Sequence, residues 1–259
     1  MLVLLPPSES KAVPPRRGTA VDHDRLSFPE LTDLRRRVLA ALIETSARPD
    51  ALALLDVGAS LTDEVARNLT LPTAPARPAH TVYTGVLYDA LGWSTLSAGA
   101  RRRGANRVLI TSALWGALRP NDRVPSYRLS MDADLPGLGP LARHWRTVLP
   151  STLERAAGPR GLVVDCRSGP YAAAAPTSGL LAARTVAIRV LREQNGNRTV
   201  VSHLAKHTRG EVTRLLLESG ADPRTPAALA EVVGTHWAVE LTSPPRTGTP
   251  WTLDVILHA

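Results

Sequence analysis

Side chains suited to acid–base or nucleophilic chemistry follow three apolar runs of this sequence, at the point where each run ends. A hydroxyl, an amine, an imidazole and a thiol are all among them, and these groups serve as general acids, bases and nucleophiles. Because the carboxyl ends of neighbouring parallel strands line one crevice, the three groups could converge. They are Ser8 and Lys11 after LVLL; Asp165, Cys166, Arg167, Ser168 and Tyr171 after LVV; and His203, Lys206 and His207 after TVVS.

Lysine is scarce in this basic chain. Of 31 basic residues only two are lysine, Lys11 and Lys206, whereas Arg, Ala and Pro are abundant together, as a drift in base composition would produce. Lysine is a compact ammonium whose pKa falls on burial, while arginine is broad and always charged. Both lysines are therefore candidate catalytic residues, with chance survival as the alternative.

Lys206 lies just before a predicted helix. Thr208 and Glu211 have the spacing of a capping box, so we expect a helix that begins at Thr208 and ends before Gly220. The free N–H groups of such a helix start, with Lys206 and Arg209 beside them, would bind phosphate or carboxylate. His203 or Lys206 would then act as acid or base; an ordinary solvated helix start is the alternative.

Cys166 is the one cysteine of the chain, which rules out an internal disulfide. It follows a strand and precedes Arg167, whose charge would favour the thiolate. With His203 as its base, Cys166 could serve as a nucleophile if the two strands adjoin. The alternative is a buried, inert thiol, which is how lone cysteines usually behave.

Residues 115–128 form an unusually stiff, cationic loop after a strand. Two prolines fix its backbone, and its arginines have the planar shape that grips carboxylate or phosphate. We expect Arg119, Tyr127 and Arg128 to hold an anion. Alternatively, Arg119 and Arg128 pair with buried carboxylates and fasten the loop.

Several more specific sequence motifs are incomplete or absent. Ser8 to Lys11 matches S-x-x-K, but the accompanying S-D-N and K-T-G are absent. His203 and His207 lack the Glu and third ligand of a zinc site, and no dinucleotide or P-loop motif occurs. No metal or cofactor is therefore expected. The sequence also has no long apolar run and no basic lead to a secretory signal, so we expect a cytoplasmic protein without a membrane partner.

The periodicity of the chain predicts a mixed α/β fold in a single domain over residues 1–259. Asn195-Gly196 between two β-branched runs predicts a β-hairpin near 185–204, which argues against a purely doubly wound sheet. The other expected strands cover 2–5, 107–114, 161–166 and 251–257. The expected helices cover 30–45, about 62–68, 81–91, 138–157 with a break near Pro150, 208–218 and 225–234.

Six blocks of this sequence resemble the YaaA family of peroxide stress proteins, in the same order and from Met1 to about Pro226. They are LVLLPPSESK, VYTGVLYDAL, SALWGALRPNDRVPSYRLSM, LGPLARHWR, VVDCRSGPY and VVSHLAKHTRGEVTRLLLESG. The Y-T-G block, which contains Tyr83 and Thr84, the G-x-L-R-P…Y-R-L loop and the K-x-x-[RK]-G segment are the most specific.

The resemblance implies a mixed α/β fold with a mixed central sheet, a helix-hairpin-helix-like element and a positively charged central cleft that binds DNA. It also implies resistance to hydrogen peroxide by limiting iron-driven DNA damage. The helix-hairpin-helix-like element would map to about 81–107. Arg101, Arg102, Arg103 and Arg107 would then contact backbone phosphates, in duplex DNA rather than single strands because few aromatic residues are placed for stacking.

The chain also departs from that family pattern. Relatives have an aliphatic residue at Cys166, and Trp, Pro and Lys where this chain has AAAAPTSG. These differences favour a second hypothesis, an enzyme acting on a nucleotide-like or other anionic small molecule. An iron-binding protein is a third hypothesis with fewer residues behind it. The formal net charge of +8 suits either DNA or an anionic ligand, and the sequence fixes no oligomeric state.

Overall fold

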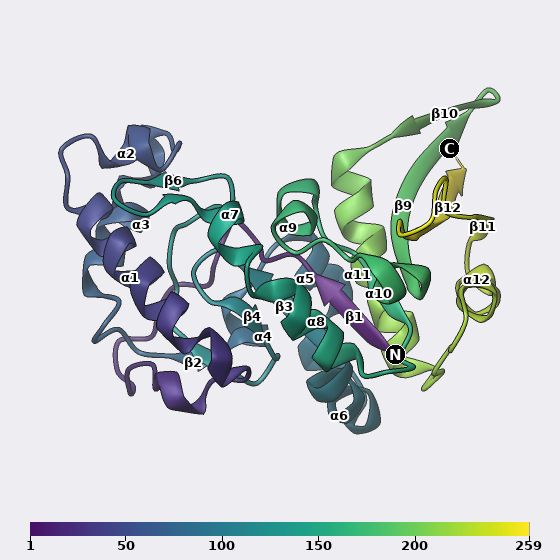
Figure 1. Ribbon diagram of the computed structural model, residues 1–259, viewed down its shortest axis with the longest axis horizontal. Coiled ribbons are helices and arrows are strands. Elements are labelled where there is room, and N and C mark those ends of the chain that lie inside the picture. The colour runs from purple at the N-terminus through teal and green to yellow at the C-terminus, as the bar shows by residue number, and fades with distance from the viewer. Residues whose placement is uncertain (259) are drawn as a thin grey trace.

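The computed structural model describes residues 1–258, apart from the side chain of residue 202. At its centre is a mixed sheet in the order β11-β12-β9-β8-β1-β3-β4, with β10 also paired to β9 (Figure 1). Its strands are β1 (Leu2–Leu5), β3 (Val108–Ser112), β4 (Gly116–Leu118), β8 (Val163–Asp165), β9 (Thr185–Gln194), β10 (Asn197–Val200), β11 (Ala238–Thr242) and β12 (Trp251–His258). Two small sheets pair β2 (Arg77–Pro78) with β5 (Arg123–Val124) and β6 (Asp134–Leu135) with β7 (Gly139–Pro140).

Helices surround this sheet, which confirms the mixed α/β class. The α-helices are α1 (Thr32–Ser46), α2 (Ala51–Leu54), α3 (Thr62–Arg67), α4 (Ala79–Val82), α5 (Val86–Leu91), α6 (Ala98–Arg107), α7 (Leu141–Trp145), α8 (Leu149–Ala157), α9 (Gly169–Ala174), α10 (Gly179–Ala183), α11 (Ser202–Glu218) and α12 (Pro226–Gly234). Five short 3-10 helices join them: η1 (His23–Arg25), η2 (Pro29–Leu31), η3 (Ala59–Leu61), η4 (Asn68–Thr70) and η5 (Trp93–Thr95). Within residues 1–258, none of the helices is long and apolar enough to cross a membrane.

The strands that matter for the site run in one direction. β1 pairs in parallel with β3 on one side and β8 on the other, and β8 pairs in parallel with β9. All residues of β1, β3 and β8 are buried, as continuous apolar runs at the centre of a covered sheet must be. The chain goes from β1 to β3 and then returns to β8 on the opposite side of β1. The carboxyl ends of β1 and β8 therefore flank a topological switch point, where α/β sheets usually bind ligands.

The β-hairpin is confirmed. β9 and β10 are antiparallel, and the turn residues Asn195 and Gly196 have φ of 52° and 75°, which fits the left-handed turn that Asn-Gly favours. The second strand is shorter than predicted, because it ends at Val200 and α11 follows almost at once.

Two predicted helices differ most from their expected limits. The helix expected over 81–91 is split into α4 and α5 by Gly85, whose φ of 95° interrupts a regular helix. The helix expected from Thr208 begins at Ser202, so the capping-box prediction is wrong. Thr208 lies in the helix interior, 2% exposed, because this part of α11 packs tightly on α5. A Cβ on Gly210 would overlap the carbonyl oxygen of Leu87.

The loop over 115–128 is anchored by an aromatic contact. Gly116 begins β4 with φ of 70°, and a Cβ there would overlap the indole ring of Trp145. Trp145 is fully buried and donates its ring N–H to the carbonyl of Ala113 at 2.7 Å. The turn after β3 therefore has its path set by a buried indole on α7, in addition to its prolines.

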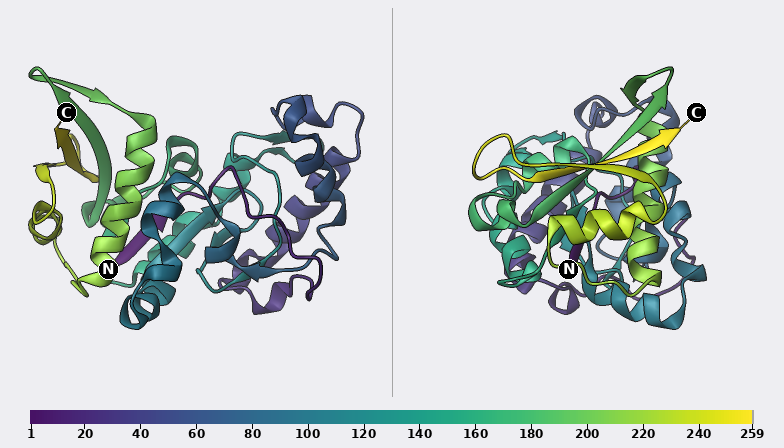
Figure 2. Two further views of the ribbon diagram at one scale, coloured as in Figure 1. Left: turned by 180° about the vertical axis from the view of Figure 1, so that it is seen from behind. Right: turned by 90° about the vertical axis from the view of Figure 1, so that its right-hand side faces the viewer.

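The layers are clearest when the molecule is seen from both sides. α11 packs against α5 and α6 on one face of the sheet, and α8 lies over the other (Figures 1 and 2). α1, α2 and α3 gather at the β4 end of the molecule, whereas α12 and β11 lie at the opposite end. The loops that follow β1, β3 and β8 lie between these two ends of the molecule.

Candidate functional site

Lys11 lies beside two buried phenol rings near the carboxyl end of β1. Its Nζ is 4.2 Å from the ring centre of Tyr127 and 5.9 Å from that of Tyr83. It donates to the carbonyl oxygens of Ser8 at 3.1 Å and of Glu9 at 3.4 Å. Burial lowers the pKa of Lys11 from 10.5 to about 8, so this amine can take up and release a proton near physiological pH.

A chain of hydroxyl groups connects this lysine site to the end of β3. Tyr127 and Ser112 share a hydrogen bond of 2.7 Å, and Tyr127 and Tyr83 share another of 3.1 Å. Burial raises the pKa of Tyr83 to about 12 and that of Tyr127 well above 10. Both phenols therefore stay protonated and can donate hydrogen bonds. Ser112 was not among the predicted site residues, although it ends the apolar strand VLITS and follows the same strand-end pattern as the other candidates.

The loop after β1 is tied to the Y-T-G segment at two points. The backbone N–H of Thr84 donates to the hydroxyl of Ser8 at 3.1 Å, and Lys11 forms an isolated antiparallel bridge with Tyr83. Five predicted site residues thus lie together. They are Ser8, Lys11, Tyr83, Thr84 and Tyr127.

Arg128 is the cation nearest to this group. Its guanidinium forms an ion pair with Glu9 at 3.1 Å and a longer one with Glu64 at 3.8 Å, and it donates to the carbonyl of Glu9 at 3.2 Å. Its Nε is buried and has no hydrogen-bond partner among the described residues. Arg128 therefore fastens the loop after β1 and still has a buried donor to offer to a ligand.

Arg119 has another environment. Its Nη1 donates to the carbonyl of Val108 at 3.1 Å, its guanidinium lies 5.4 Å from the ring centre of Phe28, and its N–H donates to Asp122 at 2.8 Å. The Arg119 guanidinium thus fastens the loop through a backbone carbonyl, whereas the fastening alternative expected a buried carboxylate as its partner. Within residues 1–258 no hydrogen bond or ion pair joins Arg119 to the lysine site.

The end of β8 is closed by a buried ion pair. Arg167 binds Asp165 through two nitrogens, at 2.7 and 2.9 Å, and donates to the carbonyl of Ala175 at 2.9 Å. Its charge is therefore taken up by Asp165. Cys166 is fully buried, and burial raises the pKa of its thiol to about 12, opposite to the shift that a nucleophile needs.

Two other residues after β8 lie at the helix that follows. Ser168 precedes α9, and Tyr171 is buried within it. Burial raises the pKa of Tyr171, and this phenol is near enough to Tyr127 to raise the pKa of that residue as well. Tyr171 therefore belongs to the surroundings of the lysine site.

The third predicted group is not at a strand end. His203 and Lys206 are exposed on the first two turns of α11 and make no hydrogen bond or ion pair within the described chain. Because Thr208 lies inside the helix, the anion site expected at its start is not there. Arg209 donates to the carbonyl of Ile188 at 3.0 Å and so joins α11 to β9.

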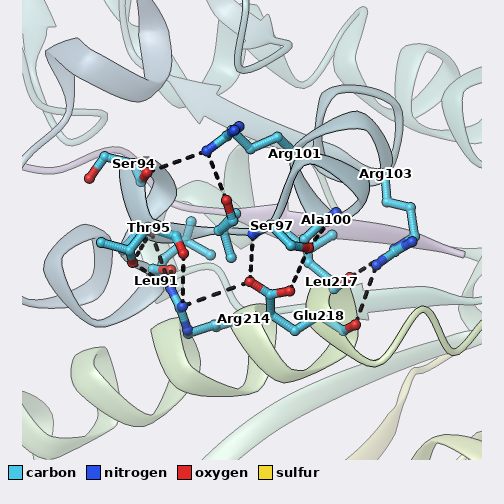
Figure 3. Close-up of polar contacts among 12 residues, drawn as sticks. Leu91, Ser94, Thr95, Ser97, Ala100, Arg101, Arg103, Arg214, Leu217 and Glu218 are labelled. Atoms are coloured by element: carbon cyan, nitrogen blue, oxygen red, sulfur yellow. Dashed lines mark hydrogen bonds and ion pairs between the residues drawn. The ribbon is translucent and has the colours of Figure 1, made fainter.

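The arginines of α6 connect this helix to its neighbours. Arg101 donates to the carbonyl of Leu96 at 2.8 Å, and Arg103 donates to the carbonyls of Leu217 at 2.8 Å and Glu218 at 3.3 Å (Figure 3). Figure 3 shows Arg103 pointing to the last turn of α11, whose carbonyls have no partner within their own helix. Arg103 is therefore a cap for α11.

Arg107 acts in a similar way beyond α11. It donates to the carbonyl of Ala221 at 2.9 Å and lies 3.7 Å from the carboxylate of Asp222. Arg102 is exposed, and its side chain has no such partner in the described part of the chain. The helix-hairpin-helix-like element over 81–107 and its phosphate contacts stay predictions, and Arg102 is the member with its whole guanidinium available.

A cavity of about 520 Å³ opens next to the lysine site. Tyr83 and Thr84 line it and also contact the loop after β1. Its other lining residues come from β1, β3 and the segment 80–95, with Pro120 at its edge; they are Leu5, His80, Thr81, Tyr88, Asp89, Leu91, Gly92, Trp93, Ser94, Thr95, Val108, Ile110 and Pro120. Within residues 1–258, no group of three or more His, Cys, Asp and Glu side chains is placed to hold a metal ion.

Comparison with known proteins covers almost the whole chain. The family model described as peroxide stress protein YaaA matches residues 1–240. A UPF0246 protein of Streptomyces coelicolor is 48% identical over 100% of this chain and 99% of its own length. UPF0246 proteins of Corynebacterium efficiens and Cereibacter sphaeroides are 38% and 30% identical, over 93% and 86% of this chain and 95% and 88% of their own lengths.

Proposed function

The chain belongs to the YaaA family of peroxide stress proteins, and we propose that it acts in the cytoplasm by acid–base chemistry on a small anionic molecule at Lys11. One observation carries this proposal. A lysine ammonium lies 4.2 Å from a buried phenol ring, at the carboxyl ends of parallel strands, with protonated phenols and an arginine around it. Convergent polar groups of this kind suit a small-molecule site better than a flat contact with duplex DNA.

Each group would have a distinct role. With a pKa of about 8, Lys11 is present in both protonated and free forms near neutral pH, so it can donate or accept a proton. One of the two phenols would donate a hydrogen bond to an oxygen on which negative charge develops, because the hydrogen bond between Tyr83 and Tyr127 uses the O–H of the other. Arg128 would hold a carboxylate or phosphate, after the exposed carboxylate of Glu9 leaves its guanidinium.

Lys11→Met tests this proposal, with Lys206→Met as its matched control because Lys206 is exposed and lacks partners in the described chain. Each variant is expressed in a bacterium whose own copy is deleted, and survival of a hydrogen peroxide challenge is counted. We expect Lys206→Met to protect as wild type does and Lys11→Met to fall to the level of the empty vector. Full protection by a Lys11→Met protein that melts normally would refute the proposal.

DNA binding is the second candidate function, favoured by the net charge of +8 and by the exposed guanidinium of Arg102. Contacts of this kind would be made to backbone phosphates of duplex DNA and would not depend on sequence. They would shield DNA from iron-driven damage.

Fluorescence anisotropy with a labelled duplex across a salt series tests this second function. Arg102→Gln should reduce the slope of log K against log salt by about 0.9, the value for one lost phosphate contact. An absence of binding at low salt would exclude the DNA hypothesis for this chain, whatever the outcome for Lys11.

A further inference from the structure

The cavity beside the lysine site has an apolar floor and aromatic walls. Leu5 and Ile110 are partners in the pairing of β1 with β3, and both line the cavity. The rings of His80 and Trp93 are stacked, with centroids 5.0 Å apart and planes 20° from parallel. At about 520 Å³ the cavity is in the size range of small-molecule sites, and walls of this kind favour a flat, aromatic ligand.

The charges around the cavity differ in sign from those of the whole protein. No Lys or Arg lines it within the described chain, although the net charge is +8. Burial lowers the pKa of His80 below its ordinary 6.5, so this ring is neutral at physiological pH. Arg214 is not among the lining residues, and it donates to the carbonyls of Leu91 and Gly92, which are. The cavity therefore offers no cation to a phosphate or carboxylate.

Asp89 is the one acidic residue in the lining. It is exposed on α5, and its carboxylate joins no ion pair or side-chain hydrogen bond in residues 1–258. An ionised carboxylate only accepts hydrogen bonds, and its two oxygens match two adjacent N–H donors. Several hydroxyl groups of the lining residues already form hydrogen bonds within the protein. That of Tyr88, for example, donates to the carbonyl of Pro6 at 2.7 Å.

We propose that this cavity binds an uncharged heteroaromatic ring that stacks beside Trp93 and presents adjacent N–H donors to Asp89, as the edge of guanine does. The cavity shares Tyr83 with the lysine site, but Lys11 does not line it and the contacts proposed here are made by Trp93 and Asp89, so loss of the lysine should leave ring binding in place. Phosphate groups on such a ligand would have to point out of the cavity.

Calorimetric titration of the full chain with guanosine, adenosine and tetramethylammonium tests this proposal. We expect guanosine to bind with submillimolar affinity, adenosine at least tenfold more weakly, and tetramethylammonium not at all. Asp89→Asn should weaken guanosine about tenfold and remove its advantage over adenosine, because the paired acceptor is lost. Asp33→Asn, an exposed aspartate on α1, is the matched control and should bind as wild type does.

Tryptophan fluorescence supplies an independent measurement. Guanosine should quench the wild-type signal, and the quenching should disappear in Trp93→Phe while Lys11→Met retains it. Saturation by tetramethylammonium alone would overturn the proposal, since the cavity would then be a site for organic cations. The absence of saturation by either nucleoside would overturn it too, and would leave the lysine proposal standing.

Discussion

At the scale of single residues, Lys11 is the amine whose pKa burial brings close to physiological pH. Burial holds its pKa at about 8, while an unfolded chain returns it to about 10.5. Between these values the unfolded state binds more protons than the folded state. Folding stability attributable to Lys11 should therefore rise as pH increases from about 8 to 10.5, and be lowest below pH 8 where both states are protonated.

This titration can be observed directly because the chain has only two lysines. In a Lys206→Arg protein, amine-selective acetylation followed by peptide mass spectrometry should show half-maximal reactivity of Lys11 near pH 8. A midpoint above pH 10 would contradict the altered environment. Between pH 8 and 10, chemical denaturation should show that the free energy of unfolding of wild type rises by ~1 kcal/mol per pH unit relative to that of Lys11→Met, because the variant lacks the titrating amine.

Gly116 gives a second prediction at this scale. Gly116→Ala combines a left-handed backbone with overlap between the new Cβ and Trp145. We expect a loss of about 3 kcal/mol in the free energy of unfolding. Gly137→Ala is the matched control, because its φ is 76° and no atom lies within 4 Å of the added Cβ. Gly137→Ala should lower the free energy of unfolding by only ~1 kcal/mol, the cost of the left-handed backbone alone. Equal losses in the two variants would show that the Trp145 ring moves aside at little cost.

At the scale of elements, α6 and α11 are joined by Arg103, which caps the end of α11. Arg103→Gln should lower the free energy of unfolding by about 1–3 kcal/mol, because carbonyls at the end of α11 lose a charged donor. Arg102→Gln, one residue away on the same helix and exposed, should leave stability within ~0.5 kcal/mol of wild type. Urea denaturation of both proteins checks this. If Arg103→Gln is as stable as wild type, Arg103 is not needed as a helix cap, and it stays a candidate for contacts with DNA.

The elements also show what sequence patterns can and cannot predict. Buried strands such as LVLL and VLITS, and the Asn195-Gly196 turn, are local signals, and these elements formed where they were expected. The start of α11 depends on a distant partner, since Gly210 lets α11 approach α5 and buries Thr208. A capping-box pattern cannot reveal that contact.

The site divides in the same way. Strand-end polarity indicated that polar groups after different strands could converge, and Ser8 and Lys11 after β1 do lie with Tyr127 from the loop beyond β3, the parallel neighbour of β1. The roles of the arginines could not be read from their positions, since a guanidinium on a carbonyl and one on a phosphate look alike in sequence. Arg103 and Arg119 each donate to a carbonyl in another element.

At the scale of the whole molecule, net charge and local charge point to different partners. The chain carries +8, yet its large cavity is lined by one carboxylate and no Lys or Arg within residues 1–258. Long-range attraction to polyanions and selection of a small ligand can therefore act on separate surfaces. Raising the salt concentration from 50 to 200 mM should sharply weaken any DNA binding and leave guanosine affinity within about twofold; parallel loss of both would show one shared site.

The family match ends at residue 240, but the sheet does not. β12 begins at Trp251 and lies between β9 and β11, with Leu253 and Val255 fully buried. A chain that ends at residue 240 would lack the interior strand β12, and one edge of β9 would be unpaired and prone to aggregation. For expression and tagging, the practical consequence is that residues 251–258 belong to the folded body, so a gene shortened at residue 240 should yield inclusion bodies.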